Sequence, residues 1–151
     1  MAEIGPLIEQ FRNIHSGPAW HGAALRPVLT EISAEQAARR PVPGAHSVWE
    51  LVQHITVWEN VFRRRLEGEQ VPDPVEDDFP PAPVVSAAAW QQTVADLDRE
   101  HDELITAISR LKDADLEASF PGKDYSIARL LEVLILHHVY HSGQIALLKK
   151  A

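Results

Sequence analysis

Three histidines of this chain occupy positions from which two helices could bring them together. His137 and His141 are four residues apart, and residues at that spacing lie one above the other on one face of a helix. His54 lies on the apolar side of a second helical pattern, SVWELVQHITVWENVF. Three imidazoles around one divalent ion leave a coordination position for water or substrate, as in catalytic zinc centres. The spacing makes the chain a candidate metalloenzyme.

Periodicity leaves one ligand and the role of the cluster open. On a helical wheel His141 points into the core, and His137 and His138 flank that direction almost symmetrically. Buried histidines usually bond to backbone carbonyls, which is the structural alternative to a metal site. Three neutral imidazoles in one apolar interior also present at least three acceptor nitrogens, and a divalent cation satisfies all of them. The pattern alone therefore supports both interpretations about equally.

Four helical patterns must position these histidines, and no segment alternates with the period of a strand. We expect an all-α fold, an up-and-down four-helix bundle that forms a single domain over residues 1–151. The predicted helices are a first one over 4–32, kinked or broken at Gly17 and Pro18, a second from Ser47 to about Gly68, a third over 86–111, and a fourth from Ser126 to about Lys149.

The segment 70–85 contains five of the eleven prolines and is predicted to be a long surface connection between helices 2 and 3. Its acidic run 76–78 is interpreted as a solvated loop. The four tryptophans, at positions 20, 49, 58 and 90, are expected in the core. His15, His46 and His101 lie in exposed-looking or boundary contexts and are assigned no role.

Composition excludes several classes of function. A net charge of -8 without a stripe of Lys and Arg disfavours nucleic acid as a partner. The chain has no cysteine, which excludes disulfides and thiolate metal sites and favours a cytoplasmic location. No apolar run is long enough for a membrane helix, so no membrane association is expected. The sequence contains no HExxH and no glycine-rich phosphate loop, which disfavours zincins and nucleotide-binding folds.

Two segments resemble a known family. HSVWELVQHITVWENVFRRRLEG, followed some seventy residues later by HHVYHSGQIALLKK, is similar to the DinB-like superfamily of small four-helix metal-binding proteins, and the similarity extends upstream to AWHGAAL and AEQAARRPVPGAHS. The resemblance implies a divalent metal, zinc or nickel, held by His54, His137 and His141, and it selects His137 over His138. It also implies open coordination positions that hold water.

Several relatives in that superfamily are transferases or isomerases that use a low-molecular-weight thiol such as bacillithiol or mycothiol, and homodimers are common. The resemblance thus implies a homodimeric, metal-dependent thiol S-transferase that acts on a small molecule, although no general base is identified. The alternatives are a non-catalytic metal-binding or stress-response bundle and a metal-dependent hydrolase. Gln144, one turn beyond His141, and His21, near the first helix, are candidates for holding a substrate or an ordered water beside the metal.

Overall fold

The computed structural model describes residues 3–120 and 123–151, and helices are the main regular elements in these ranges. Its elements are α1 (Ile4–His15), α2 (Leu25–Leu29), α3 (Ala34–Ala38), α4 (Val48–Leu66), α5 (Ala87–Ser109), the 3₁₀ helix η1 (Asp113–Glu117) and α6 (Ile127–Leu148). Within the described ranges, β pairing is limited to one isolated bridge between Ser119 and Ser126. The predicted all-α class is confirmed.

Serine caps begin the three longest helices where the sequence predicts them. The Ser47 hydroxyl accepts a hydrogen bond from the backbone N–H of Glu50, and the Glu50 carboxylate accepts one from the N–H of Ser47, which completes a capping box at α4. Ser86 and Ser126 cap α5 and α6 in the same way through one hydrogen bond each. These caps set the helical register that places the histidines.

The first helical pattern is divided into separate elements. Helix α1 ends at His15, and helical structure resumes only at Leu25, after Gly17, Pro18 and a glycine at position 22 with φ of 140°. Trp20 lies in this connection and is fully exposed, so the expectation that it belongs to the core is wrong. Trp49 and Trp90 are buried as expected.

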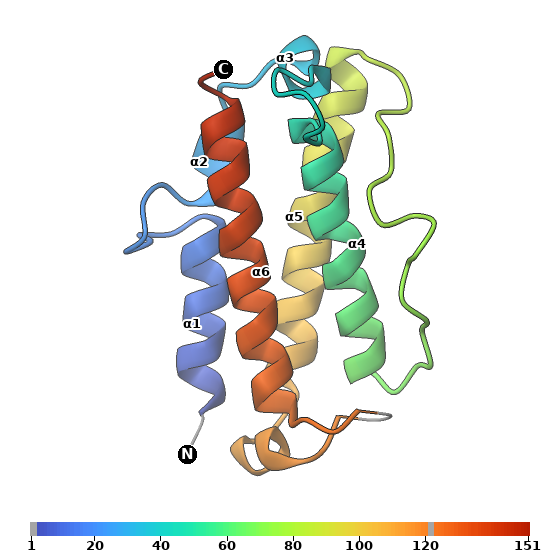
Figure 1. Ribbon diagram of the computed structural model, residues 1–151. Coiled ribbons are helices and arrows are strands. Elements are labelled where there is room, and N and C mark those ends of the chain that lie inside the picture. The colour runs from blue at the N-terminus through green and yellow to red at the C-terminus, as the bar shows by residue number, and fades with distance from the viewer. Residues whose placement is uncertain (1–2, 121–122) are drawn as a thin grey trace.

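The four longest helices lie side by side, but α4 and α5 run in the same direction (Figure 1). Trp49 and Trp90, near the first residues of α4 and α5, have ring centroids 5.1 Å apart, and Glu67 pairs with Arg110 at the opposite ends. The predicted up-and-down connectivity is therefore wrong. The cause is the connection between Leu66 and Ala87: its roughly 20 residues, if extended at about 3.1 Å each, exceed the length of about 28 Å of α4 and allow the chain to return along that helix.

The core consists of two apolar clusters with a polar layer between them. One cluster contains Phe11 and Phe62 and the other Trp49 and Ile55, so that Glu59 of α4 falls between the two. Each of the four longest helices contributes one buried polar residue to this layer: His15, Glu59, His101 and His138. The sequence pattern predicted that His15 and His101 are exposed or boundary residues, and this is wrong, because the two residues are only 6% and 2% exposed.

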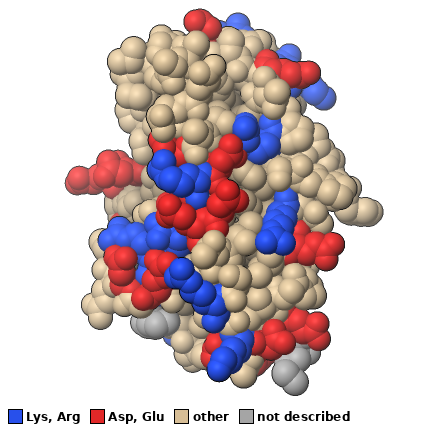
Figure 2. All heavy atoms as spheres, turned by 180° about the vertical axis from the view of Figure 1, so that it is seen from behind, with Lys and Arg blue, Asp and Glu red and all other residues tan. Residues whose placement is uncertain are grey.

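Surface charge is mixed on the face turned away from the viewer of Figure 1. Figure 2 shows acidic and basic side chains interspersed there, with no broad area of one sign. Ion pairs such as Arg63 with Glu103 and Arg99 with Asp96 bring side chains of opposite sign together. In the described part of the chain, no helix is both long enough and apolar enough to cross a membrane.

Candidate metal centre

The three predicted ligands come together where α4 packs against α6. One ligand nitrogen from each of His54, His137 and His141 lies within 4.8 Å of the others. His54 Nε2 and His137 Nε2 are 2.8 Å apart. His54 and His141 are buried, whereas His137 is half-buried, so the cluster lies just beneath the surface.

Two neighbouring side chains fix which nitrogens face the centre. His54 Nδ1 lies 2.7 Å from the backbone oxygen of Asp78 and 3.0 Å from its carboxylate, and both of these groups only accept hydrogen bonds. His54 Nδ1 must therefore carry the proton, which leaves a lone pair on Nε2. His141 Nδ1 donates to Gln144 Oε1 at 2.6 Å with the same consequence. Such partners on the far ring nitrogen are typical of histidines that bind metals.

The distances fit a divalent first-row ion after a small adjustment. Zinc–nitrogen bonds of about 2.0–2.1 Å in a tetrahedral arrangement require ligand nitrogens about 3.3 Å apart. The Nε2 atoms of His54 and His137 would have to separate by about 0.5 Å from their present 2.8 Å. His137 Nδ1 is buried and has no hydrogen-bond partner in the described chain. The Nε2 atoms of His54 and His137 face each other and Gln144 engages Nδ1 of His141, so the three residues fit a metal through Nε2.

Burial keeps the three imidazoles neutral. It is the largest cause of the lowered pKa of His137, about 3, and the neighbouring His141 and His54 lower it further. Burial also lowers the pKa values of His54 and His141, although Asp78 and Gln144 oppose the shift. Neutral imidazole is the form that binds a metal, so the site is poised to accept a cation at ordinary pH.

The connection 67–86 supplies part of the centre. Asp78 accepts hydrogen bonds from His54 and, at 2.7 Å, from the indole N–H of Trp58. Phe79 stacks on His54 with ring centroids 3.9 Å apart, and His46 stacks on the other face of Phe79 at 3.7 Å. The interpretation of this acidic run as a merely solvated loop is therefore wrong for Asp78. His46, which was assigned no role, supports the aromatic wall.

His138 points away from the centre toward a different part of the core. Its Nδ1 is 3.1 Å from Glu59 Oε1, and His101 Nδ1 is 3.0 Å from the same oxygen. Burial alone would raise the pKa of Glu59, but the charges and hydrogen bonds of His101 and His138 hold it well below its usual range. The geometry therefore distinguishes His137 from His138, which the wheel could not do. A signal for the second cluster was present, since Glu59 and His101 each continue an apolar stripe of their helix.

The two residues proposed to assist the centre are placed differently. Gln144 lies beside it, bonded to His141 and, through its side-chain nitrogen, to the Tyr140 hydroxyl at 3.3 Å. His21 is exposed in the connection between α1 and α2, and no described contact joins it to the three histidines. The structure brings Gln144 to the cluster and leaves His21 outside it.

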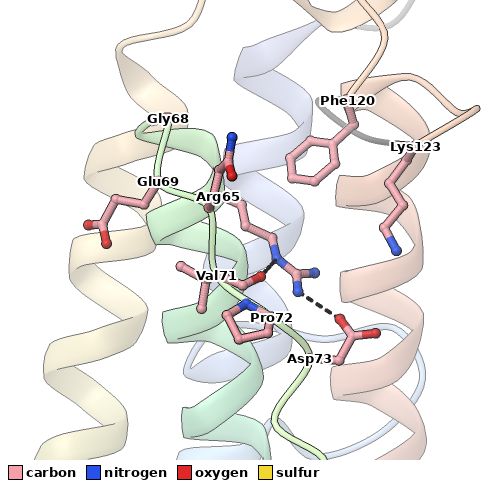
Figure 3. A pocket seen from close by; sticks show the side chains of 9 residues that line it. Arg65, Gly68, Glu69, Val71, Pro72, Asp73, Phe120 and Lys123 are labelled. Atoms are coloured by element: carbon pink, nitrogen blue, oxygen red, sulfur yellow. Dashed lines mark hydrogen bonds and ion pairs between the residues drawn. The ribbon is translucent and has the colours of Figure 1, made fainter.

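An open pocket lies at the C-terminal end of α4 (Figure 3), lined by Arg65, Val71, Asp73, Phe120 and Lys123 among others. The Arg65 guanidinium donates to Val71 O at 2.8 Å and to the Asp73 carboxylate at 2.6 Å. Its cation is therefore already paired, and none of the three clustered histidines lines the pocket. The histidine cluster remains the stronger candidate.

Comparison with known proteins places the chain in a family. No curated protein and no solved structure shows significant similarity to it. A family model described as the DinB superfamily matches residues 19–145, which span α2 to α6 and include all three clustered histidines. Since the match covers most of the sequence, the chain belongs to the DinB superfamily.

Proposed function

We propose that this protein binds one divalent cation, zinc or nickel, through the Nε2 atoms of His54, His137 and His141. The observation that carries the proposal is the pair of hydrogen bonds from His54 and His141 to Asp78 and Gln144. Those bonds fix two lone pairs toward one point, where His137 supplies a third nitrogen. A set of three nitrogen ligands leaves room for an exchangeable fourth.

We further propose that the centre is catalytic and transfers a low-molecular-weight thiol to a small electrophilic substrate. The bound ion would supply Lewis acidity and lower the pKa of a thiol or water. The protein itself contains no cysteine, so a reacting sulfur has to come from a second substrate. His137 is only half-buried and Tyr140 is exposed beside it, which supports access from solvent along α6.

The residues around the centre have separate tasks in this proposal. Asp78 and Gln144 hold the rings of His54 and His141 in the orientation that ligation requires. Phe79 and Trp58 form an apolar wall on the α4 side, which strengthens electrostatic interactions by excluding water. The Gln144 amide, already within reach of Tyr140, is positioned to bind a polar group of the substrate.

The decisive experiment compares turnover of a panel of electrophiles by the metal-loaded, chelated and His137→Ala proteins, each with and without added small thiols. His21→Ala is the matched control, because it removes an imidazole that lies outside the cluster. We expect activity that requires both metal and thiol and survives His21→Ala. Turnover that continues after chelation would remove the centre from the mechanism. Metal-dependent hydrolysis without thiol would favour a hydrolase, and no turnover on any substrate would favour a non-catalytic metal-binding or stress-response protein.

We also propose that the chain folds as one domain, a four-helix bundle of α1, α4, α5 and α6, and acts in the cytoplasm as a homodimer. Helix α6 supports the dimer, because four of its exposed apolar residues lie within about 60° of one another on the helical wheel. They are Val133, Leu136, Tyr140 and Leu147. The absence of cysteine favours a reducing compartment, and the interspersed charges favour a small-molecule substrate over nucleic acid.

A further inference from the structure

The polar layer between the two apolar clusters contains a second convergence of metal-binding groups. One ligand atom each from Glu59, His101 and His138 lies within 4.8 Å of the others. The three residues are at most 2% exposed and come from three different helices, α4, α5 and α6. A domain of this size can fill its centre with aliphatic side chains, so a fully buried carboxylate between two imidazoles needs a specific explanation.

Hydrogen bonds within the protein do not complete this cluster. Glu59 Oε1 accepts from His101 Nδ1 and His138 Nδ1, at 3.0 and 3.1 Å. Glu59 Oε2, His101 Nε2 and His138 Nε2 are all buried and have no partner in the described part of the chain. With Nδ1 of both rings donating to Glu59 Oε1, neither ring Nε2 nor the second carboxylate oxygen has a partner, so three buried polar atoms remain unsatisfied.

The surrounding residues supply no donor to these three atoms. His15 stacks on His101 with ring centroids 4.0 Å apart, so that it presents its face to the cluster, and its Nε2 is engaged by Asp98 at 2.9 Å. Ser142 donates its hydroxyl to the backbone oxygen of His138 rather than to the ring. Glu100, the other buried carboxylate nearby on α5, is bonded to Asn60 and Arg63 and faces away.

We propose that Glu59, His101 and His138 form a second divalent-metal site, separate from the centre of His54, His137 and His141. Two imidazoles and a carboxylate suit borderline first-row ions such as Zn²⁺, Co²⁺ or Fe²⁺ rather than Ca²⁺ or Mg²⁺, which prefer oxygen ligands only. The ion neutralises the buried carboxylate and takes the place of the two hydrogen bonds that Glu59 now accepts, with the converging atoms of the three side chains as its ligands. Because all three ligands are buried, this ion is structural: it joins α4, α5 and α6 and does not meet substrate.

The test counts ions in the full-length protein after loading with Zn²⁺ and removal of free metal, by native mass spectrometry and elemental analysis. Wild type should hold about two ions per chain, and a His54→Ala/His137→Ala/His141→Ala variant should keep about one. Adding Glu59→Gln to that variant should remove the remaining ion. Glu100→Gln is the matched control, since it makes the same change in a neighbouring buried carboxylate outside the cluster, and it should leave both counts unchanged.

The result separates this site from the proposed function. A triple variant that holds no ion, with a wild type that holds one, would overturn the second site and leave the first intact. A remaining ion that Glu59→Gln does not release would equally overturn it. Thermal unfolding gives a readout independent of activity: Zn²⁺ should raise the midpoint of the triple variant and leave that of the variant with Glu59→Gln unchanged. The number of ions in the wild-type protein is measured without any substitution in the buried cluster. A wild type that holds only one ion therefore counts against the second site even if a variant misfolds.

Discussion

Replacing Asp78 by alanine should weaken binding of Zn²⁺ by about tenfold, or about 1.4 kcal/mol. Loss of a group that orients a metal-binding histidine typically costs about 10- to 100-fold in affinity. The low end applies here because the backbone oxygen of residue 78, 2.7 Å from His54 Nδ1, still accepts a hydrogen bond from that nitrogen after the substitution. The variant loses the carboxylate, 3.0 Å from the same nitrogen, and the partner of the Trp58 indole.

Competition against a chromophoric chelator measures this change. The effect of Asp78→Ala should be measured in the wild-type background and again in a Glu59→Gln background. In the second background, ions in the second cluster do not contribute to the titration. Asp77→Ala is the control, since it removes an exposed carboxylate from the adjacent position of the same connection. Equal affinity in Asp78→Ala and wild type would refute the role of the carboxylate in orienting His54. An equal loss of Zn²⁺ affinity in Asp77→Ala would show that removal of a nearby negative charge, and not the orientation of His54, causes the effect.

Four further outcomes are expected. Because burial, first of all, and the neighbouring histidines lower the pKa of His137 to about 3, bound zinc should persist at about pH 5.5 and be released on further acidification, as dialysis and elemental analysis can show. The same shift means that the unfolded chain binds more protons than the folded one, so the metal-free protein should lose stability to urea as the pH falls from 6.5 toward 3, and a gain would contradict the assignment. Ser47→Ala removes the cap of α4 and should lower the free energy of unfolding by about 1 kcal/mol in urea titrations, whereas no change would show that the cap is redundant. Leu136→Glu should convert the proposed dimer to a monomer in analytical ultracentrifugation; Val75→Glu, at an exposed residue outside α6, should not, and a persistent dimer would exclude this face of α6.

Signals between residues close in sequence predicted the helices and their caps, whereas features that depend on contacts between helices were not predicted. The caps at Ser47, Ser86 and Ser126 depend on residues three positions apart, and all three are present in the structure. Whether His137 or His138 faces His54 depends on how α6 is rotated against α4, which periodicity determines only to within one residue.

The features that could not be predicted from the sequence depend on contacts between residues far apart in the chain. Asp78 reaches His54 only because the connection 67–86 returns along α4, and this path is not indicated by residues close in sequence. The parallel direction of α4 and α5 follows from the same path (Figure 1). An up-and-down bundle assumes short connections, which this chain does not have between these two helices. The apolar stripes place Glu59 and His101 on the inner faces of their helices, but no motif indicates that they meet His138, because the three residues lie on three helices.

Anomalous diffraction at the zinc edge, from crystals of the zinc-loaded protein, tests the central claim most directly. We predict a peak about 2.0–2.1 Å from the Nε2 atoms of His54, His137 and His141, with the first two of these nitrogens separated to about 3.3 Å from the present 2.8 Å. The hydrogen bonds from His54 to Asp78 and from His141 to Gln144 should be retained. An absence of anomalous density between these three rings, in a protein shown to contain zinc, would contradict the assignment of this cluster as the metal centre.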